Sequence, residues 1–125
     1  MIIGLGSDIM DIARMKRELS RTDLDIRRDL FTEHEIMYCT AKRYPERHFA
    51  ARFAAKEAMV KSLPVEKKAP LRWQDIEIRN TTNGKPYFFF TGELQALIEK
   101  LAVRTVLVTL SHTPAWAMAT VILES

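Results

Sequence analysis

The sequence predicts an α+β fold, in which helices pack on a largely antiparallel sheet within one compact domain. The length of 125 residues suits a single domain, which we expect to span 1–125. Short apolar or alternating runs near both ends and in the second half are typical of strands. A long run with helical periodicity lies between them. Strands joined by turns, together with helices, indicate the α+β class.

The first predicted elements are a strand and an amphipathic helix. Residues 2–7 are a short apolar run with glycines, which predicts the strand. Residues 9–19 place apolar side chains near one face and basic ones elsewhere, which predicts the helix. Asp8 lies between the two, so its position alone favours a role as helix N-cap. Thr32 and Glu35 have the spacing of a capping box, which predicts the start of another helix.

The longest predicted helix follows Pro45 and is stopped by Pro64. Its apolar stripe consists of Phe49, Phe53, Val60 and Leu63. Lys56 projects into this stripe, so its ammonium group must reach water or find an anion. Glu57 and Lys61 share the neighbouring face. Their spacing also fits an ordinary surface ion pair, worth about 0.2–0.5 kcal/mol.

The second half predicts strands joined by turns. Residues 73–79 alternate between apolar and charged side chains, as in a half-buried strand. Asn83-Gly84 is a strong turn signal that joins this strand to a returning strand at 87–90. The remaining elements are a helix at 92–101, strands at 105–110 and 115–123, and between those strands a turn at 111–114.

Composition narrows the functional classes. The net charge of +3 favours an anionic ligand or an acidic partner over wholesale binding of a nucleic-acid backbone. Cys39 is the only cysteine, which excludes an internal disulfide, and no Cys/His group has zinc spacing. Residues 1–6 lack the basic region of a signal peptide and the length of a membrane span. We therefore expect a cytoplasmic protein without a membrane partner.

Single residues leave the function open. Gly4 and Gly6 do not complete a dinucleotide-binding motif, because the third glycine is missing. Asn83-Gly84 is explained by the hairpin alone, and a histidine in a turn, such as His112, is more often exposed than catalytic. Only the combination of these residues is informative.

Together the residues resemble the holo-acyl-carrier-protein synthases. The matching blocks occur in the order and near the spacing of that family and span nearly the whole chain. They are Gly6-Ser7-Asp8-Ile9 with Ile12 and Arg14; Phe31-Thr32 with Glu35 and Cys39; residues 52–58 (RFAAKEA) with Lys61; residues 73–78 (WQDIEI); residues 83–86 (NGKP); and residues 110–113 (LSHT).

The resemblance implies a 4′-phosphopantetheinyl transferase, which moves the phosphopantetheine arm of coenzyme A to a serine of an acyl carrier protein and releases adenosine 3′,5′-bisphosphate. It also implies a homotrimer with active sites between subunits, which would add buried surface to a short chain. Two alternatives stay open. One is a catalytically impaired relative that only binds nucleotide or carrier protein, and the other is a small basic nucleic-acid-binding domain.

The resemblance also assigns roles to residues. Asp8 and Glu57 are the expected ligands of Mg²⁺, and Glu57 or a metal-bound water is the expected base for the carrier serine. Lys61 would stabilise charge on the phosphates, with Lys56 helping to hold the diphosphate. Arg52 and His112 are candidates for the ribose 3′-phosphate. The full set expected to bind coenzyme A is Arg52, Lys56, Lys61, Asn83, Gly84, Lys85, Pro86, Ser111, His112 and Thr113.

Basic residues near the first helix suggest how an acidic carrier protein would dock. Arg14, Arg21 and Arg28 are the candidates, although a solvated basic face is the ordinary alternative. The loop at 62–70 departs from the family pattern, because it lacks the glycines that usually follow the lysine matched by Lys61. We therefore expect an altered donor cleft.

Overall fold

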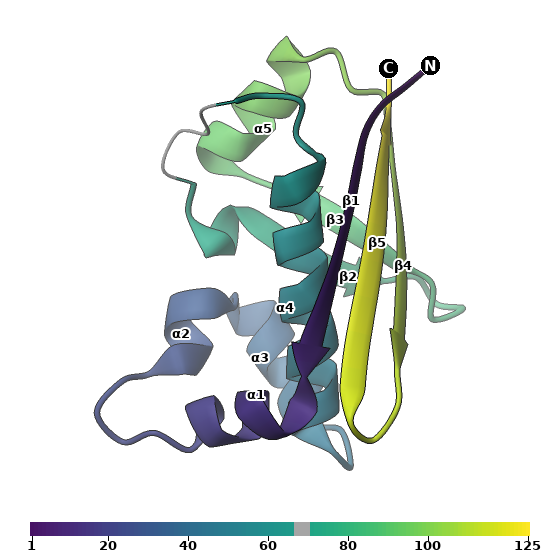
Figure 1. The fold of residues 1–125 in the computed structure, drawn as a ribbon. Helices are drawn as coiled ribbons and strands as arrows, with labels where there is room; N and C mark the ends of the chain where they lie inside the picture. Colours follow the sequence, from purple (N-terminus) through teal and green to yellow (C-terminus); the bar gives the residue numbers. More distant parts are fainter. Residues whose placement is uncertain (67–70) are drawn as a thin grey trace.

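The computed structural model describes residues 1–66 and 71–125, and Figure 1 shows their path. The main sheet is antiparallel with the order β1-β5-β4. A second antiparallel sheet contains only β2 and β3. The bounds are β1 Ile2–Asp11, β2 Ile76–Asn80, β3 Pro86–Phe90, β4 Thr105–His112 and β5 Trp116–Glu124. The α+β prediction is confirmed, although the strands form two sheets rather than one.

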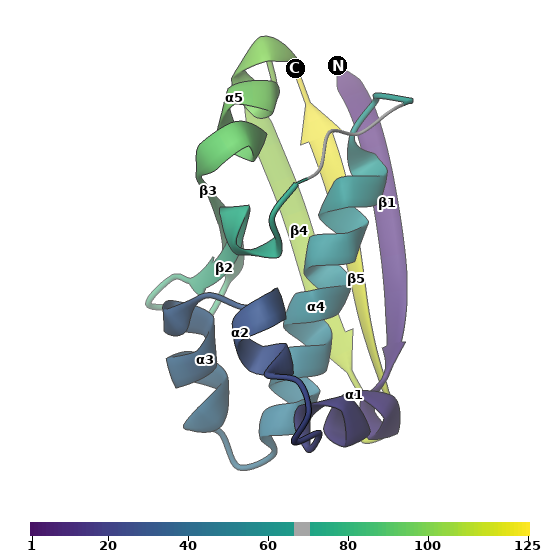
Figure 2. The ribbon, with the colours of Figure 1, turned by 90° about the vertical axis from the view of Figure 1, so that its left-hand side faces the viewer.

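Helix α4 (Pro45–Ser62) lies along one face of the main sheet and is the centre of the molecule (Figures 1 and 2). It begins with a proline in its first turn and ends before Pro64, as predicted. The other helices gather at its two ends, with the first three at one end and the last at the other. They are α1 (Ile12–Leu19), α2 (Ile26–Leu30), α3 (Glu33–Thr40) and α5 (Gly92–Lys100).

The boundary between β1 and α1 differs from the prediction. Strand β1 continues to Asp11, because it pairs with β5 along its whole length, down to the partners Asp11 and Trp116. The N-cap of α1 is therefore Asp11, whose Oδ1 accepts a hydrogen bond from the Arg14 amide at 3.2 Å. Asp8 lies inside the strand, opposite Ala119. The N-cap expectation for Asp8 was wrong, and its side chain is free for another role.

Two glycines allow β1 to approach α4 closely. A Cβ atom on Gly6 would overlap the carbonyl oxygen of Ala58, and one on Gly4 would overlap that of Ser62. On the helix side the contact surface consists of small residues, with Ala54 and Ala58 fully buried. Short side chains on both elements therefore bring the strand and the helix backbone together.

Of the other element boundaries, some agree with the prediction and some do not. The capping box of α3 is present: the Thr32 hydroxyl accepts from the Glu35 amide at 3.3 Å, and Thr32 N donates to the Glu35 carboxylate at 2.9 Å. The predicted strand at 73–79 begins instead with a 3₁₀ turn, Trp73–Asp75. Gly84 has a φ of 86°, which agrees with the predicted hairpin turn. His112 is the last residue of β4 and does not lie in the turn, because it pairs with Ala117.

The core has two parts. One lies between α4, the main sheet and β2, and includes Met59, Ile78 and Val121. The other lies among α1 to α3 and the first half of α4, and includes Phe31 and Phe49, whose ring centroids are 4.9 Å apart. Helix α4 contributes to both and joins them.

The outer face of the main sheet is covered by no described element. Alternate residues of its strands point away from α4, and several are large and apolar: Leu5, Ile9, Leu107, Trp116 and Met118 are all exposed. Among the residues that the structure describes, no helix is both long and apolar enough to cross a membrane.

Candidate active site

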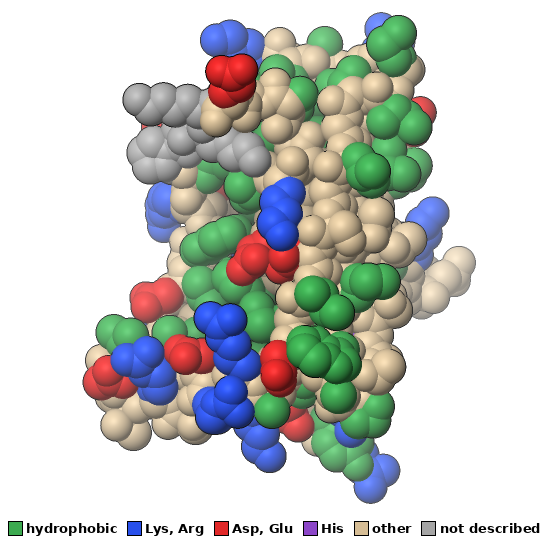
Figure 3. All heavy atoms as spheres, viewed as in Figure 1, with side chains coloured by type: hydrophobic (Ala, Val, Ile, Leu, Met, Phe, Trp, Pro, Cys, Tyr) green, Lys and Arg blue, Asp and Glu red, His purple; other side chains and the backbone are tan. Residues whose placement is uncertain are grey.

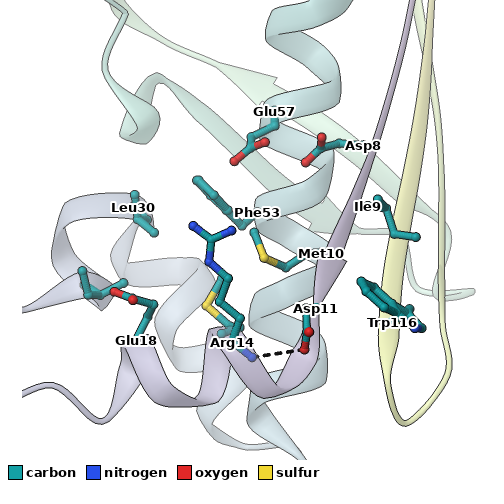
Figure 4. Close-up of a pocket in the computed structure, with 12 residues that line it drawn as sticks. Asp8, Ile9, Met10, Asp11, Arg14, Glu18, Leu30, Phe53, Glu57 and Trp116 are labelled. Carbon is teal, nitrogen blue, oxygen red and sulfur yellow. Dashed lines mark hydrogen bonds between the residues drawn. The ribbon is translucent and has the colours of Figure 1, made fainter.

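Asp8, Glu57 and Lys61 meet where β1 passes the middle of α4. Strand alternation turns Asp8 toward the helix, and Glu57 and Lys61 lie one turn apart on the facing side. Lys61 Nζ donates to Asp8 Oδ1 at 2.6 Å and to the Ser7 carbonyl oxygen at 3.4 Å. Figure 4 shows the carboxylates of Asp8 and Glu57 close to each other at the top of a cavity. The structure thus brings together the three residues expected to be catalytic.

The ionisation of Glu57 is shifted by its surroundings. Partial burial, a hydrogen bond with Asp8 and the charge of Asp8 raise the pKa of Glu57 to about 7, against smaller opposing effects of Lys61 and Arg14. The hydrogen bond with Asp8 raises the pKa of Lys61, so this amine stays charged. Near neutral pH, Glu57 is therefore able to accept or release a proton.

The cavity beneath these carboxylates has a volume of about 670 Å³. Its apolar wall comes from β1, α1, α2 and α4 and includes Met10, Leu30 and Phe53. Arg14 projects into it from α1 (Figure 4). Figure 3 shows the same region as a hollow with acidic and basic side chains at its upper edge and further basic side chains below. Such a site suits a long ligand with a charged end and a less polar body.

The donor set fits a hard divalent cation. Asp8 and Glu57 offer carboxylate oxygens, which Mg²⁺ prefers, and a cation between them would relieve the repulsion that raises the pKa of Glu57. In the described part of the chain, no group of three or more His, Cys, Asp and Glu residues could hold a metal ion. A cation here would therefore use the two carboxylates and take its other ligands from substrate or water oxygens.

Lys56 has a different role from the one expected. It is fully buried, and its ammonium group contacts Glu35 Oε1 at 2.6 Å, the Leu30 carbonyl oxygen at 2.8 Å and the Trp73 carbonyl oxygen at 3.0 Å. These partners use all three N–H donors, so none is left for a diphosphate. The anion that Lys56 requires is Glu35, and the expectation of coenzyme A binding by Lys56 is corrected.

A second cavity, of about 190 Å³, lies beside the first turns of α4. The guanidinium of Arg52 forms one wall: it stacks on the Tyr38 ring at 3.8 Å and donates through Nη2 to Asn80 Oδ1 at 2.6 Å. The expected residues Gly84, Pro86 and His112 also line this cavity, as do Tyr38, His48 and Asn80, which sequence reasoning missed. His48 could have been noticed, because it precedes Arg52 by one helical turn.

The other expected ligand-binding residues are dispersed. Asn83 and Lys85 belong to the exposed tip of the β2–β3 hairpin and do not line the cavity of Arg52. Ser111 and Thr113 lie at the β4–β5 end, beside Trp116, in a shallow hollow on the outer sheet face. No ligand contact in this structure tests these four assignments, which stay predictions.

The basic residues expected to dock a carrier protein have different surroundings. Arg14 lines the main cavity. Arg21 forms exposed ion pairs with Glu18 and Asp23, and Arg28 pairs with Asp25 and Glu33. These acidic neighbours reduce the positive potential of the last two, so Arg14 is the most available of the three. Of the glycine-free loop, residues 67–70 lie outside the described part of the chain.

The fold and the carboxylate pair define a small α+β domain with an acidic site, and the comparison with known families specifies its class. A model of the 4′-phosphopantetheinyl transferase superfamily matches residues 4–120. The chain belongs to this superfamily, as the sequence resemblance predicted.

Relatives place the chain more closely. It is 40% identical to the holo-[acyl-carrier-protein] synthase of Geobacter sulfurreducens over 99% of this chain and 98% of the relative. A crystal structure of the Neisseria meningitidis synthase has a TM-score of 0.90 at 27% identity and full coverage of both chains. The Bacillus anthracis synthase in complex with CoA (3′,5′-ADP) has a TM-score of 0.81 at 30% identity, covering 100% of this chain and 98% of that one.

Proposed function

We propose that this chain transfers the 4′-phosphopantetheine group of coenzyme A to a serine of an apo acyl carrier protein, with release of adenosine 3′,5′-bisphosphate. The observation that carries the proposal is the meeting of Asp8, Glu57 and Lys61 above a long cavity in a chain of this superfamily. The similarity to holo-[acyl-carrier-protein] synthases supports an acyl carrier protein as the acceptor, and the complex of the Bacillus anthracis synthase with CoA (3′,5′-ADP) supports the donor.

The residues of the site can divide the chemistry between them. The serine oxygen attacks the β-phosphorus, the bond from that phosphorus to the bridging oxygen breaks, and the bridging oxygen leaves with the nucleotide. Glu57 accepts the serine proton, directly or through a water molecule. Lys61 stays charged and stabilises the negative charge on the phosphate oxygens.

Mg²⁺ is the cofactor proposed for this site, with Asp8 and Glu57 as its protein ligands. When bound, such an ion neutralises charge on the phosphates and aligns them for displacement. The support is the donor chemistry of the two carboxylates and their mutual repulsion. Lys61 neutralises Asp8 only in part, because its side chain is 55% exposed and its charge is screened by water.

An acidic carrier protein is the proposed acceptor partner. Arg14 projects into the main cavity below the carboxylates, so it can contact an acidic protein whose serine reaches Glu57. Arg21 and Arg28 would contribute at the edge of the contact, where their existing ion pairs and solvent exposure weaken their effect. The mild net charge gives no support to a nucleic-acid partner, and the cytoplasmic location stays a prediction.

A homotrimer is the proposed assembly. Its support is the apolar outer face of the main sheet, where Leu5, Ile9, Leu107, Trp116 and Met118 are exposed together. Contiguous exposed apolar surface of this kind is typical of protein interfaces. The shallow hollow that contains Ser111 and Thr113 lies on the same face, so a neighbouring subunit would cover these residues.

The direct test is to mix the protein with coenzyme A, MgCl₂ and apo carrier protein and to measure the intact mass of the carrier. We expect the mass of one phosphopantetheine to be added, and no addition to a carrier whose acceptor serine is replaced by alanine. No mass change with any carrier tested would contradict the proposal. If coenzyme A still bound, the result would favour a catalytically impaired relative.

A further inference from the structure

The small cavity beside Arg52 holds more positive and ionisable groups than the sequence suggested. His48 lies in it with its ring centroid 5.5 Å from that of His112 and 6.1 Å from that of Tyr38. The two imidazoles come from α4 and β4 and make an edge contact, with an angle of 66° between the ring planes. Arg52 lies one helical turn beyond His48.

The charged groups with the largest effect on the pKa of His48 are positive or become positive on protonation. They are His112 from β4, Lys42 from the segment before α4, and Arg47 and Arg52 from α4 itself. Tyr38 of α3 is the remaining titratable group in contact. No acidic side chain lines the cavity among the described residues. A cavity lined in this way concentrates positive potential, which an anion would neutralise.

Arg52 has unused hydrogen-bonding capacity. Arg52 is only 2% exposed. Its guanidinium donates one hydrogen bond to Asn80, and its Nε has no hydrogen-bond partner in the described part of the chain. A buried guanidinium with unused donors is costly unless an anion or ordered water completes its contacts. This is a second and independent indication of an anion at the same place.

We propose that His48 is a phosphate-binding residue, which together with His112 and Arg52 binds a terminal phosphomonoester and not a phosphodiester or an unphosphorylated ribose. The inference rests on the proposed function, in which that group is the 3′-phosphate of coenzyme A. It adds a residue that selects coenzyme A over its 3′-dephospho form.

The imidazole pair makes this binding sensitive to pH. Burial, followed by the charges of His112, Lys42, Arg52 and Arg47, lowers the pKa of His48, so its ring is neutral at pH 7 when the cavity is empty. A phosphate dianion reverses the balance of charge and favours the protonated ring. Binding therefore takes up a proton, and affinity rises as the pH falls from 8.5 toward 6.5.

The test is isothermal titration of the protein, in MgCl₂, with adenosine 3′,5′-bisphosphate and with adenosine 5′-monophosphate. At pH 6.5, His48→Phe is expected to weaken binding of the bisphosphate by about tenfold, the size of one lost charge-assisted hydrogen bond. At pH 8.5 the difference should shrink to about twofold. Binding of the monophosphate should not change, because it lacks the 3′-phosphate.

Controls separate a binding role from a structural one. Phenylalanine keeps the aromatic contact with Tyr38, and His48→Gln provides a second, uncharged variant in case the first is unstable. His34→Gln removes an exposed imidazole outside the cavity and should leave both affinities as in the wild type. Proton uptake on binding, measured in buffers of different ionisation enthalpy, should be lower in both His48 variants.

Three results would overturn the inference: unchanged bisphosphate affinity in both His48 variants, equal losses for bisphosphate and monophosphate, or no bisphosphate binding by the wild type. The proposed function is judged separately by the mass of the carrier. If the wild type modifies the carrier while the His48 variants keep full bisphosphate affinity and pH dependence, the inference fails and the function stands. If the His48 variants selectively lose affinity for the bisphosphate but the wild type does not modify the carrier, the result would support the phosphate site and contradict the proposed transferase function.

Discussion

At the scale of single residues, the site depends on two carboxylates that the fold holds close together. Asp8 has only 11% of its side chain exposed, and Glu57 is half-buried beside it. Two such groups do not both ionise freely without a nearby cation, and the charges of Lys61 and Arg14 compensate them only in part. Burial of Glu57, together with the hydrogen bond and charge of Asp8, therefore raises the pKa of Glu57.

The raised pKa of Glu57 predicts a pH-dependent loss of stability in the metal-free protein. The carboxyl titrates at about 7 in the folded state against an ordinary value of 4.5, so the folded state binds more protons between these values. The contribution of Glu57 to stability is complete below pH 4.5 and is lost as the pH rises through 7. In EDTA, the free energy of unfolding of the wild type should therefore fall relative to that of Glu57→Gln as the pH rises from 4.5 through 7. Urea unfolding measures this difference.

Parallel stability curves for the two proteins from pH 4.5 to 8 would contradict this explanation of the Glu57 pKa. Added MgCl₂ provides a further control. It should raise the free energy of unfolding at pH 7.5 more in the wild type than in Glu57→Gln, because a bound cation removes the repulsion.

Lys56→Met should destabilise the protein strongly. The change leaves the Glu35 carboxylate fully buried without its cation, and breaking such a pair costs about 3–5 kcal/mol. Lys100→Met, which removes an exposed lysine from α5, is the matched control and should change stability by less than about 0.5 kcal/mol. Similar denaturation midpoints for the two variants would show that the buried ion pair does not contribute this much to the free energy of unfolding.

At the scale of elements, the contact between β1 and α4 sets the distance between Asp8 and Glu57. Gly6 lies two residues before Asp8, where the backbones of strand and helix are closest. The strand alternation then turns Asp8 toward the helix, where Lys61 reaches it. Strand register, helix phase and the absence of a Cβ atom at Gly6 together determine the geometry of the site.

Gly6→Ala should therefore impair both stability and activity. The new methyl group would overlap the Ala58 carbonyl oxygen and push β1 from α4, at a cost of about 1–3 kcal/mol. Transfer activity should fall further than the unfolded fraction explains, because Asp8 moves with the strand. Ser7→Ala, on the exposed side of the same strand, should retain most activity. Equal activity of the two variants, at matched folded fractions, would contradict the close-approach argument.

Elements with local signals were predictable, whereas those set by distant partners were not. The capping box at Thr32 and the turn at Gly84 depend on neighbouring residues, and both were predicted. The extent of β1 depends on pairing with β5 more than 100 residues away, so the strand was placed too short and the N-cap was assigned to Asp8 instead of Asp11. The position of His112 was missed although its partner is local, because the pairing of His112 with Ala117 extends β4 into the expected turn.

The residues of the site were also predicted only in part. Asp8, Glu57 and Lys61 were identified through the family resemblance, because spacing alone fitted a cap and a surface ion pair equally well. Lys56 was misassigned, since its partner Glu35 lies on a different helix and no local pattern connects them. His48 carries no motif, and only the packing of β4 beside α4 brings it to His112.

At the scale of the whole molecule, the apolar outer face of the main sheet predicts self-association. Leu107 is 46% exposed on β4, the edge strand of that sheet, so Leu107→Asp should convert an oligomer to monomers, because a charge would be buried at the interface. Light scattering during size-exclusion chromatography measures this directly. Gln95→Asp, on the exposed side of α5, should leave the assembly unchanged. A monomeric wild type, or an unchanged mass for Leu107→Asp, would contradict the proposed trimer.

The central claim is that Asp8 and Glu57 form one site for phosphopantetheine transfer. The most direct measurement is the rate at which wild type, Asp8→Asn and Glu57→Gln add phosphopantetheine to an apo carrier, followed by intact mass with coenzyme A and MgCl₂. Each variant keeps the shape of the side chain and should remain folded by circular dichroism. We expect each to slow transfer at least about 100-fold, the lower range for losing a general base or a charge-stabilising group. Folded variants with rates near that of the wild type would contradict the claim.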